Sequence, residues 1–474
     1  MATRPSAPAW LVEPADANDL VAGVWPDSAA RDDSGRLTIG GVDAARLARE
    51  FGTPLYVTDE TQVRERAARV LDAFSSAFGR VGADVSVYYA GKAFLSTEVA
   101  RWVAEAGLRI DVCSGGELAV ALAAGMDPAL LGFHGNNKSL AEIERAVAVG
   151  VGTIVIDSRI EIDRVADAAA RAGRVQAVRL RVNSGVHAHT HEFLATAHED
   201  QKFGIPLTDA AEFVAVIRSR TELSFLGLHC HIGSQIFDAG GFAESAARLI
   251  AVHAELLADG PVPELNLGGG FGIAYTAADA PTPIERIADG MAAAVAAECA
   301  GRGIPVPRIA IEPGRFIVGS AGITLYEVGT VKPVVVDGGV RTYVSVDGGM
   351  SDNARPALYG ADYSARLAGR ASDAAPVLVR VAGKHCESGD IVVDADYLPG
   401  DVRPGDLLAV AATGAYCWSL ASNYNYLGRP AVVAVHDGDA RVIVRGETEA
   451  DLLSRDAGIA VPTPARTDSL EGAR

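Results

Sequence analysis

Short apolar runs alternate with Ala-rich stretches of helical periodicity over most of the first two thirds of the chain. Stretches such as 61–78, 117–124, 140–149 and 242–258 carry apolar residues three or four positions apart, which predicts amphipathic helices. Strands that alternate with helices pair in parallel, because each crossover between parallel neighbours needs a helix. The runs predicted to be strands are Pro54–Val57, Val85–Ala90, Leu108–Val112, Leu130–His134, Thr153–Ile156, Ala177–Val182, Phe225–His231, Glu264–Leu267 and Arg308–Ile311.

These runs fit an α/β fold with a closed, eight-stranded (β/α)8 TIM-type barrel, provided that one run, the first, lies outside the barrel. The rhythm alone also allows an open, doubly wound sheet. After about Ile323 the pattern changes, because strand-like runs are separated by Gly, Asp and Pro turns and long helical patterns are nearly absent. This texture is typical of an antiparallel β domain.

The same patterns divide the chain into segments. Residues 1–20 are rich in Pro, Ala and Asp and are expected to be mobile. We expect 21–53 to pack on the β domain, and 21–39 are a candidate additional strand of it. The barrel then covers 54–322, the β domain 323–455, and a tail 456–474.

Composition excludes several classes of protein. Hydrophobic residues make up 49% and charged residues 22%, which is incompatible with a wholly disordered chain. The net charge of −18 argues against general nucleic-acid binding and against an anionic membrane surface. No apolar run is long enough to span a bilayer, and residues 1–14 lack the basic-then-apolar order of a signal peptide. The five cysteines are scattered without a CxxC pair, so we expect free thiols and a cytoplasmic protein.

Ligands collect at the carboxyl ends of strands in barrels and open α/β sheets, and several predicted strands end in reactive residues. Lys92 follows the run Val85–Ala90, so it is predicted at the edge of a buried site. Burial favours the neutral amine, which is the nucleophilic form that a Schiff base requires. A solvated surface lysine is the alternative, and only the neighbouring motifs argue against it.

Two histidines end a later strand. Alternation places His229 and His231 on one face, with Cys230 opposite. Zinc needs further ligands, and the sequence shows no third one nearby, so no metal is expected. An imidazole stacked on a flat ligand and a hydrogen-bonded core histidine are the remaining interpretations.

A glycine run follows the strand Glu264–Leu267. Gly268, Gly269 and Gly270 allow a turn whose N–H groups approach an anion closely, and Ser234 offers a hydroxyl to the same anion. A simple tight turn is the alternative. The run matches neither the dinucleotide fingerprint nor a P-loop.

Glu312, Gly314 and Arg315 come directly after the strand Arg308–Ile311. A carboxylate at that depth needs a protonated partner. An ion pair between Glu312 and Arg315 is one interpretation. In the other, Glu312 faces a ring nitrogen of a ligand and Arg315 binds an acidic group.

The β domain carries candidate groups as well. The segment Cys386–Asp390 combines a thiol with two acids in a turn, and a thiol can act as a proton donor. An ordinary turn with a buried cysteine is the alternative. Arg355, Tyr359, Tyr416 and the cluster Asn423–Tyr426 offer further polar groups, although isolated aromatic residues more often serve packing.

Taken in order, these segments resemble the fold-type III pyridoxal-phosphate-dependent decarboxylases. The similarity covers most of the chain, from about Pro54 to Val433, and six ordered motifs make a chance match improbable. Within the family the motifs are most similar to those of enzymes that convert meso-2,6-diaminopimelate to L-lysine and CO₂, the last step of bacterial lysine biosynthesis. The motifs are Tyr89–Ala93, His231–Ser234, Gly268–Gly270, Glu312–Arg315, Cys386–Asp390 and Gly414–Tyr416.

The resemblance implies a barrel followed by a β domain and assigns roles to individual residues. Lys92 would form the Schiff base with pyridoxal 5'-phosphate, and Cys386 would donate the proton. The site would be completed across a homodimer, so Cys386 and Glu387 would serve the partner subunit's Lys92. The implied cofactor contacts are Lys92, His231, Ser234, Gly268, Gly269, Gly270, Glu312, Gly314, Arg315 and Tyr416. The implied contacts to a small amino-acid substrate are Arg315, Arg355, Tyr359, Glu387 and Tyr416.

Several alternatives stay open at this point. A decarboxylase of the same family acting on ornithine, arginine or a carboxylated polyamine would not need an arginine for a distal carboxylate. The segment Cys386–Asp390 fits an alanine racemase poorly. A non-catalytic homologue would have no use for Lys92, Glu312 and Cys386, and a dehydrogenase would show the dinucleotide fingerprint.

Two segments depart from the family pattern. Phe94 stands where the family often has Asn after the Lys-Ala pair. The segment 189–198 resembles the family's active-site loop, but Ala195 and Ala197 replace more usual residues. Neither change touches the implied chemistry, and both bear on loop closure and specificity.

Overall fold

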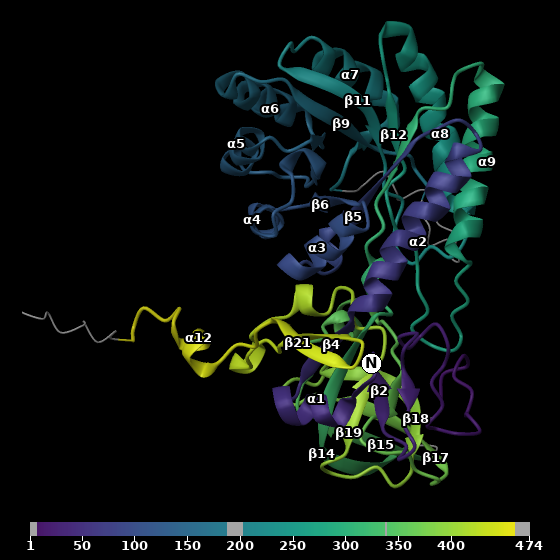
Figure 1. Cartoon of the computed structure of the whole chain (residues 1–474), viewed down its shortest axis with the longest axis vertical. Helices are drawn as coiled ribbons and strands as arrows, with labels where there is room; N and C mark the ends of the chain where they lie inside the picture. The colour runs from purple at the N-terminus through teal and green to yellow at the C-terminus, as the bar shows by residue number, and fades with distance from the viewer. Residues whose placement is uncertain (1–6, 187–201, 337–338, 460–474) are drawn as a thin grey trace, which may run out of the picture.

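The computed structural model describes residues 7–186, 202–336 and 339–459. Its two parts are stacked along the long axis, with a barrel above a β domain in Figure 1. Eight parallel strands form the barrel, and the last strand pairs with the first, which closes the ring. The closed barrel predicted from the sequence is therefore confirmed over the open sheet. Its strands are β5 (Val85–Ala90), β6 (Arg109–Val112), β7 (Leu131–Phe133), β8 (Thr153–Ile156), β9 (Gln176–Asn183), β11 (Leu223–His229), β12 (Glu264–Asn266) and β13 (Arg308–Ile311), and β10 (Ile205–Pro206) adds a short pairing to β9.

Helices surround the ring and return the chain from each strand to the next. Serines begin three of them, because the side chains of Ser96, Ser114 and Ser139 accept hydrogen bonds from free N–H groups of the first turn. Helix α2 (Glu60–Gly79) packs beside helix α9 (Ile284–Arg302) along one side of the barrel (Figure 1). The helices are α2 (Glu60–Gly79), α3 (Thr97–Glu105), α4 (Gly115–Ala123), α5 (Leu140–Val149), α6 (Arg159–Ala172), α7 (Ala210–Arg218), α8 (Gly240–Leu256) and α9 (Ile284–Arg302), followed by α10 (Arg315–Val318).

The sheet of the β domain is mixed, whereas the sequence predicted an antiparallel one. Two neighbouring pairs, β15 with β17 and β20 with β4, run parallel. Parallel neighbours need a long connection, and the whole barrel separates β4 from β20. The domain's elements are β4 (Leu55–Asp59), β14 (Gly322–Val336), β15 (Gly339–Val346), α11 (Arg355–Tyr359), β16 (Ala365–Leu367), β17 (Pro376–Ala382), β18 (Ile391–Pro399), β19 (Leu407–Val410), β20 (Val432–His436), β21 (Asp439–Val444) and α12 (Glu449–Leu453).

The first predicted strand belongs to the β domain. Strand β4 pairs with β14 on one side and with β20 on the other. It therefore lies outside the barrel, as the strand count required. The barrel is inserted between β4 and β14 of one sheet.

The N-terminal strands form a small sheet of their own, so residues 21–39 do not add a strand to the β domain. Gly40 and Gly41 have positive φ angles of 56° and 80°, so β2 turns tightly back onto β3. Apolar side chains of this segment still pack against strands of the β domain, with Leu37 in one cluster with Leu55 and Ile323. The elements are β1 (Ala30–Arg31), β2 (Leu37–Ile39), β3 (Val42–Asp43) and α1 (Ala44–Phe51).

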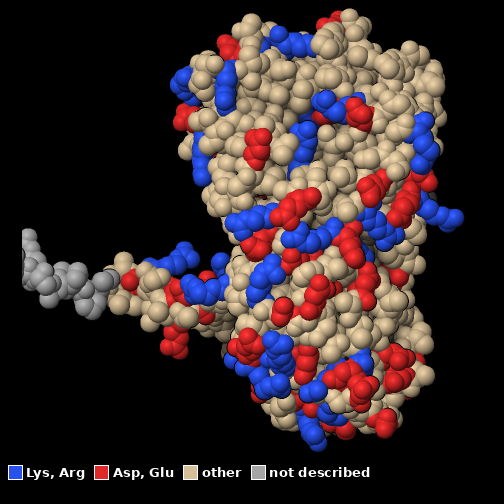
Figure 2. Space-filling model, viewed as in Figure 1, with Lys and Arg blue, Asp and Glu red and all other residues tan. Residues whose placement is uncertain are grey.

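Charged side chains of both signs gather in a band where the barrel meets the β domain (Figure 2). Arg441 of β21 pairs with Glu60 of α2 at 2.6 Å and with Glu98 of α3 at 3.2 Å, so ion pairs join the two parts. Among the helices in the described ranges, none combines the length and the apolar composition needed to cross a bilayer.

Candidate active site

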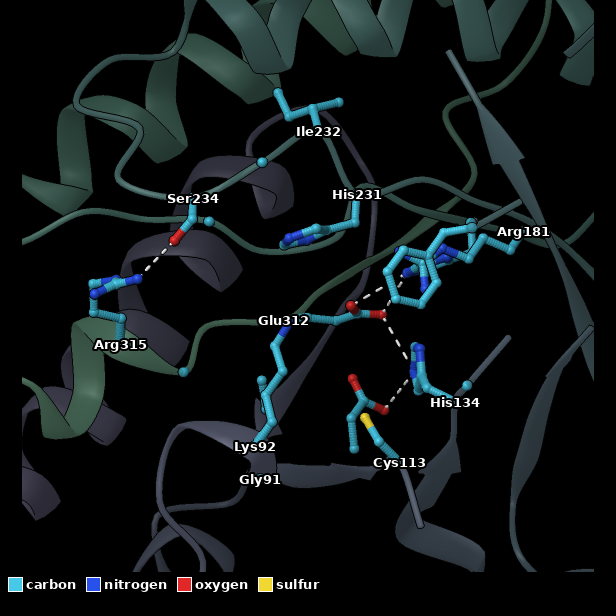
Figure 3. Close-up of a pocket in the computed structure, with 18 of the residues that line it drawn as sticks. Gly91, Lys92, Cys113, His134, Arg181, His231, Ile232, Ser234, Glu312 and Arg315 are labelled. Atoms are coloured by element: carbon cyan, nitrogen blue, oxygen red, sulfur yellow. Dashed lines mark hydrogen bonds and ion pairs between the residues drawn. The ribbon is translucent and has the colours of Figure 1, made fainter. Parts of the chain in front are cut away.

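A cavity of about 500 Å³ opens at the carboxyl ends of the barrel strands, and we call it the barrel cavity. Figure 3 shows Lys92 and His231 pointing into it from opposite sides, with Glu312 on its floor. Most of the residues implied by the resemblance meet here, although they come from strands far apart in the sequence. Those that line it are Lys92, His231, Ser234, Gly270, Glu312, Gly314, Arg315 and Tyr416.

Lys92 lies in a single 3-10 turn, Gly91–Ala93, directly after β5. The carbonyl oxygen of Ala93 accepts hydrogen bonds from Tyr416 N at 2.7 Å and from Ser419 Oγ at 3.0 Å, so the β domain fixes this turn. The side chain of Lys92 is exposed in the open cavity. Lys92 thus lies at the edge of the barrel cavity, and its amine is not buried within one chain, because the apolar strand ends before it.

Glu312 is held by donors from two other strands. Asn266 Nδ2 donates to Glu312 Oε1 at 2.7 Å, and His229 Nε2 lies 3.0 Å from the same oxygen. Burial by itself raises the pKa of this carboxyl group, but the neighbouring histidines, with His229 first, outweigh burial and bring the pKa well below its usual range. Glu312 is therefore ionised at neutral pH.

A second acid and a third histidine lie behind Glu312. His134 Nε2 is 3.1 Å from Asp111 Oδ1 and 3.6 Å from Glu312 Oε1. Burial, followed by the charge of Glu312, raises the pKa of Asp111 well above its usual range, and burial lowers the pKa of His134 to about 4. The pocket floor thus holds two buried carboxyl groups whose pKa values are shifted in opposite directions, with the imidazole of His134 between them. Gly132 makes room for this, since a Cβ there would lie 2.1 Å from Asp111 Oδ1.

The sequence singled out His229 and Glu312 but not their meeting with His134, because the three residues come from three strands. His134, His229 and Glu312 place ligand atoms within 4.8 Å of one another, close enough to share a cation. Glu312 already accepts hydrogen bonds from His229 and Asn266, whereas the buried atoms His134 Nε2 and His229 Nδ1 have no hydrogen-bond partner among the described residues. Asp111 and His134 stand at strand ends, and the strand-end rule applied to every strand would have found them.

The opposite side of the barrel cavity is suited to an anion. Arg315 Nη2 donates to Ser234 Oγ at 2.8 Å, and Arg315 Nη1 donates to the hydroxyl of Tyr275. The guanidinium also lies 4.7 Å from the ring centroid of Tyr416. An ion pair between Arg315 and Glu312 is not formed, because the two side chains point to different sides of the cavity (Figure 3).

The three glycines Gly268, Gly269 and Gly270 have different surroundings. Gly270 lines the barrel cavity, and a Cβ on it would lie 2.4 Å from Gly233 O. The amide groups of Gly268 and Gly269 already donate to Asn266 Oδ1 and His231 Nδ1, at 2.8 and 3.2 Å. These two glycines therefore shape the loop and orient the His231 ring, while Gly270 faces the cavity.

A second cavity of about 1080 Å³, which we call the outer cavity, adjoins the first. Lys92, Ser234, Arg315 and Tyr416 line both cavities. The outer cavity adds Arg355 and Tyr359, as well as Tyr275 and Trp10, which the sequence did not single out.

Arg355 is a nearly buried cation in the wall of the outer cavity. Its side chain donates to the hydroxyl of Tyr363 at 2.6 Å and stacks 4.8 Å from the ring centroid of Tyr275. Within the part of the chain that the structure describes, no carboxylate forms an ion pair with Arg315 or Arg355. Both arginines therefore keep a charge that an acidic ligand can neutralise.

Cys386 and Glu387 lie away from both cavities of their own chain. They are exposed in the turn between β17 and β18, and neither is among the described residues that line the two cavities. Cys386 N donates to Asn425 Oδ1 at 3.1 Å. One chain therefore does not bring this thiol to its own Lys92.

The two departures from the family pattern have different outcomes. Phe94 is buried, and its ring contacts that of Trp418 edge to face at 5.4 Å, so it packs the barrel against the β domain. Ala195 and Ala197 lie outside the described residues.

Two further residues of the barrel cavity, Arg181 and Phe203, were not singled out in the sequence. The guanidinium of Arg181 stacks 4.2 Å from the ring centroid of Phe203.

Comparison with known proteins identifies the class. Residues 61–319 match the family model for the pyridoxal-binding domain of pyridoxal-dependent decarboxylases. The match spans the barrel and includes Lys92, His231 and Ser234, together with Glu312 and Arg315. The chain belongs to the pyridoxal-dependent decarboxylases, and it is a carboxy-lyase.

The relatives within that family share one activity by name. The diaminopimelate decarboxylase of Mycobacterium tuberculosis is 52% identical over 92% of this chain and 98% of its own length. That of Bacillus subtilis is 46% identical over 89% of this chain and 95% of its own length. A crystal structure of the diaminopimelate decarboxylase from M. jannaschii in complex with L-lysine has a TM-score of 0.85 at 32% identity, covering 92% of this chain and 98% of that one.

Proposed function

We propose that this chain is a diaminopimelate decarboxylase that converts meso-2,6-diaminopimelate to L-lysine and CO₂ with pyridoxal 5'-phosphate. The observation that carries the substrate assignment is Arg355 in the wall of the outer cavity. It is a buried arginine in the same cavity as Lys92 and has no carboxylate partner in the described residues. The names of the relatives support the same reaction.

The residues of the barrel cavity fit the cofactor. Its phosphate would be held by Ser234, Gly270 and Arg315, where the absence of a Cβ on Gly270 lets the backbone come close. Gly314 sits in the same wall, and a Cβ on it would lie 3.0 Å from the Cβ of Ala90. Lys92 would supply the amine and His231 would cover one ring face.

Glu312 would bind the pyridine nitrogen. When bound, the cofactor supplies an electron-withdrawing ring that accepts the charge left as CO₂ departs. Glu312 is ionised, and its carboxylate would hold a proton on that nitrogen. Its donors Asn266 and His229 keep the carboxylate in place, and Asp111, whose pKa is raised by burial, lies behind the pair.

The outer cavity would bind the distal end of the substrate. Diaminopimelate carries a second carboxylate and ammonium group far from the reacting carbon. A guanidinium forms paired hydrogen bonds with a carboxylate, so Arg355 is suited to that group and Tyr359 lies on the same wall. Tyr416 lines both cavities and would contact cofactor and substrate.

The proton donor would come from a second copy of the chain. Cys386 and Glu387 are exposed outside both cavities, and Tyr424, whose ring stacks on that of His385 next to Cys386, is 40% accessible. A homodimer would cover these side chains and bring Cys386 to the partner subunit's Lys92. Glu387 would then meet the distal ammonium group of the substrate. We also propose a cytoplasmic location, from the scattered free cysteines.

CO₂ release by the purified, cofactor-loaded protein tests the proposal. The substrates compared are meso-diaminopimelate, ornithine, arginine and carboxynorspermidine. We expect release, with lysine as product, from diaminopimelate alone. Release from a polyamine precursor or from ornithine would overturn the substrate assignment and leave the fold, the cofactor and Lys92 in place.

A further inference from the structure

The segment Asn423–Tyr426, singled out in the sequence but not used by the proposed function, contacts the turn that carries Cys386. Asn425 Oδ1 accepts a hydrogen bond from the backbone N–H of Cys386 at 3.1 Å. The residues that precede Cys386 and Asn425 are His385 and Tyr424. Their rings stack in parallel, with centroids 5.5 Å apart and an interplanar angle of 3°. Two adjacent contacts therefore join these segments.

The base of the Cys386 turn is fixed independently. Asp390 Oδ2 accepts from His385 N at 2.8 Å and lies 2.9 Å from His385 Nδ1, and Asp390 Oδ1 accepts from Met350 N at 2.6 Å. Gly383 leaves no free space there, since a Cβ on it would lie 2.2 Å from Asp390 Oδ2. This clamp ends at His385, one residue before the thiol.

Beyond the clamp, the turn depends on Asn425. Glu387 and the residues after it bond mainly to one another, with Ser388 Oγ and Gly389 N both 3.3 Å from Glu387 Oε1. The backbone of Cys386 itself is held by the Asn425 side chain. The backbone at Cys386 is therefore held by a neighbour outside its own turn.

Asn425 is itself placed by a tightly held backbone. It has a left-handed conformation (φ 51°, ψ 26°), which Asn tolerates better than most residues. Asn423 Nδ2 donates to Leu427 O at 3.0 Å and to Glu447 Oε2 at 2.5 Å, which closes the loop around it. Ser422 N donates to Ser351 O at 2.8 Å, so the segment is also tied to the chain that leads into α11.

We infer that Asn425 is a positioning residue for proton donation: its side-chain carbonyl holds the backbone of Cys386 so that the thiol meets the reacting carbon in the partner subunit's site. This rests on the proposed function, in which Cys386 donates the proton. A proton donor displaced by a fraction of its hydrogen-bond reach loses efficiency without any loss of substrate binding. The inference therefore concerns kcat rather than KM.

The main test is Asn425→Gly in the cofactor-loaded dimer. Glycine accepts the left-handed conformation and removes only the accepting side chain. We expect kcat to fall roughly tenfold to hundredfold, with KM, cofactor absorbance and Tm close to wild type. Hydrogen exchange at the Cys386 amide should become faster. Asp437→Gly is the matched control, because Asp437 has a φ of 49° in an exposed turn between β20 and β21, and it should keep wild-type kcat.

A conservative variant separates positioning from folding. Asn425→Asp keeps an acceptor for Cys386 N–H, so most of kcat and the slow amide exchange should return. An Asn425→Asp variant that stays as slow as Asn425→Gly although its Cys386 amide is again protected from exchange would overturn the inference.

A double-mutant cycle distinguishes this inference from the proposed function. Cys386→Ala should be slow, and adding Asn425→Gly to it should cause no further loss. If Cys386→Ala turns over at the wild-type rate, the donor assignment fails. If Cys386→Ala is slow but Asn425→Gly has normal kcat, or if the two losses multiply, only the positioning role fails.

Discussion

His229 Nε2 lies 3.0 Å from Oε1 of Glu312 on the floor of the barrel cavity. The contact joins the ends of β11 and β13, and Asn266 at the end of β12 donates to the same carboxylate. Three neighbouring strands thus hold one ionised acid under the proposed position of the cofactor ring. No single strand of the barrel could supply this environment.

Replacing Glu312 with Gln should lower kcat about hundredfold or more, because a neutral amide cannot hold a proton on the ring nitrogen. The size of the side chain and its contact with Asn266 are largely kept. Steady-state kinetics with diaminopimelate measure the effect, with Glu298→Gln on the outer helix α9 as control. A kcat within about twofold of wild type would remove Glu312 from this role.

Lys92→Ala should abolish turnover together with the absorbance of bound cofactor, because no other lysine is among the described residues that line the barrel cavity. Absorbance spectra after cofactor loading and CO₂ release are the two measurements. Lys332→Ala, at an exposed position of β14, should behave like wild type. Decarboxylation by the Lys92 variant at the wild-type rate would contradict the assignment.

Mixing inactive subunits tests the shared site. In a dimer of one Lys92→Ala and one Cys386→Ala subunit, one site carries both changes and the other carries neither. Random pairing of equal amounts should therefore recover about one quarter of wild-type activity. Differently tagged subunits allow the mixed dimer to be isolated. Isolated mixed dimers without activity would show that Cys386 does not serve the partner subunit's site.

His134 should make stability depend on pH below neutrality. Burial lowers its pKa to about 4 in the folded chain from 6.5. The imidazole of His134 therefore binds a proton less readily in the folded chain than in the unfolded chain. Its contribution to the free energy of unfolding is complete above about pH 6.5 and is lost as the pH falls towards 4. His134→Gln lacks this titration. Between pH 7 and 4, wild type should lose up to about 3 kcal/mol relative to the variant in urea unfolding. A constant difference would contradict the assignment.

The apolar periodicity predicted strands alternating with helices, because buried parallel strands and their covering helices both leave a strong pattern, but by itself it did not distinguish a closed barrel from an open sheet. It also placed Lys92, His231 and Glu312 at strand ends that meet in space. The pattern could not reveal the pairing of Asp111 with His134, since a cross-strand contact depends on register. Nor could it show that the amides of Gly268 and Gly269 donate hydrogen bonds within the protein rather than to a ligand. Three identical residues in a row give no sign of which amide faces the cavity.

The mixed character of the second sheet escaped prediction for a related reason. Strand β4 has the same apolar pattern as a barrel strand, and only the strand count excluded it from the ring. Arg315 gave a similar ambiguity, since nearness to Glu312 in sequence made an ion pair reasonable. Tertiary contacts with Ser234 and Tyr275 decide its direction instead.

The insertion of the barrel into the β-domain sheet also sets an order of assembly. Strand β4 is complete at Asp59, but its two neighbours begin only at Gly322 and Val432. On the ribosome, the barrel can therefore close while β4 still lacks both partners. The second sheet must form last, around a strand made among the first, and its pairing ties the beginning of the chain to its end. A polypeptide released before β20 would carry a closed barrel and an unpaired strand edge, which is the form most exposed to aggregation and proteolysis.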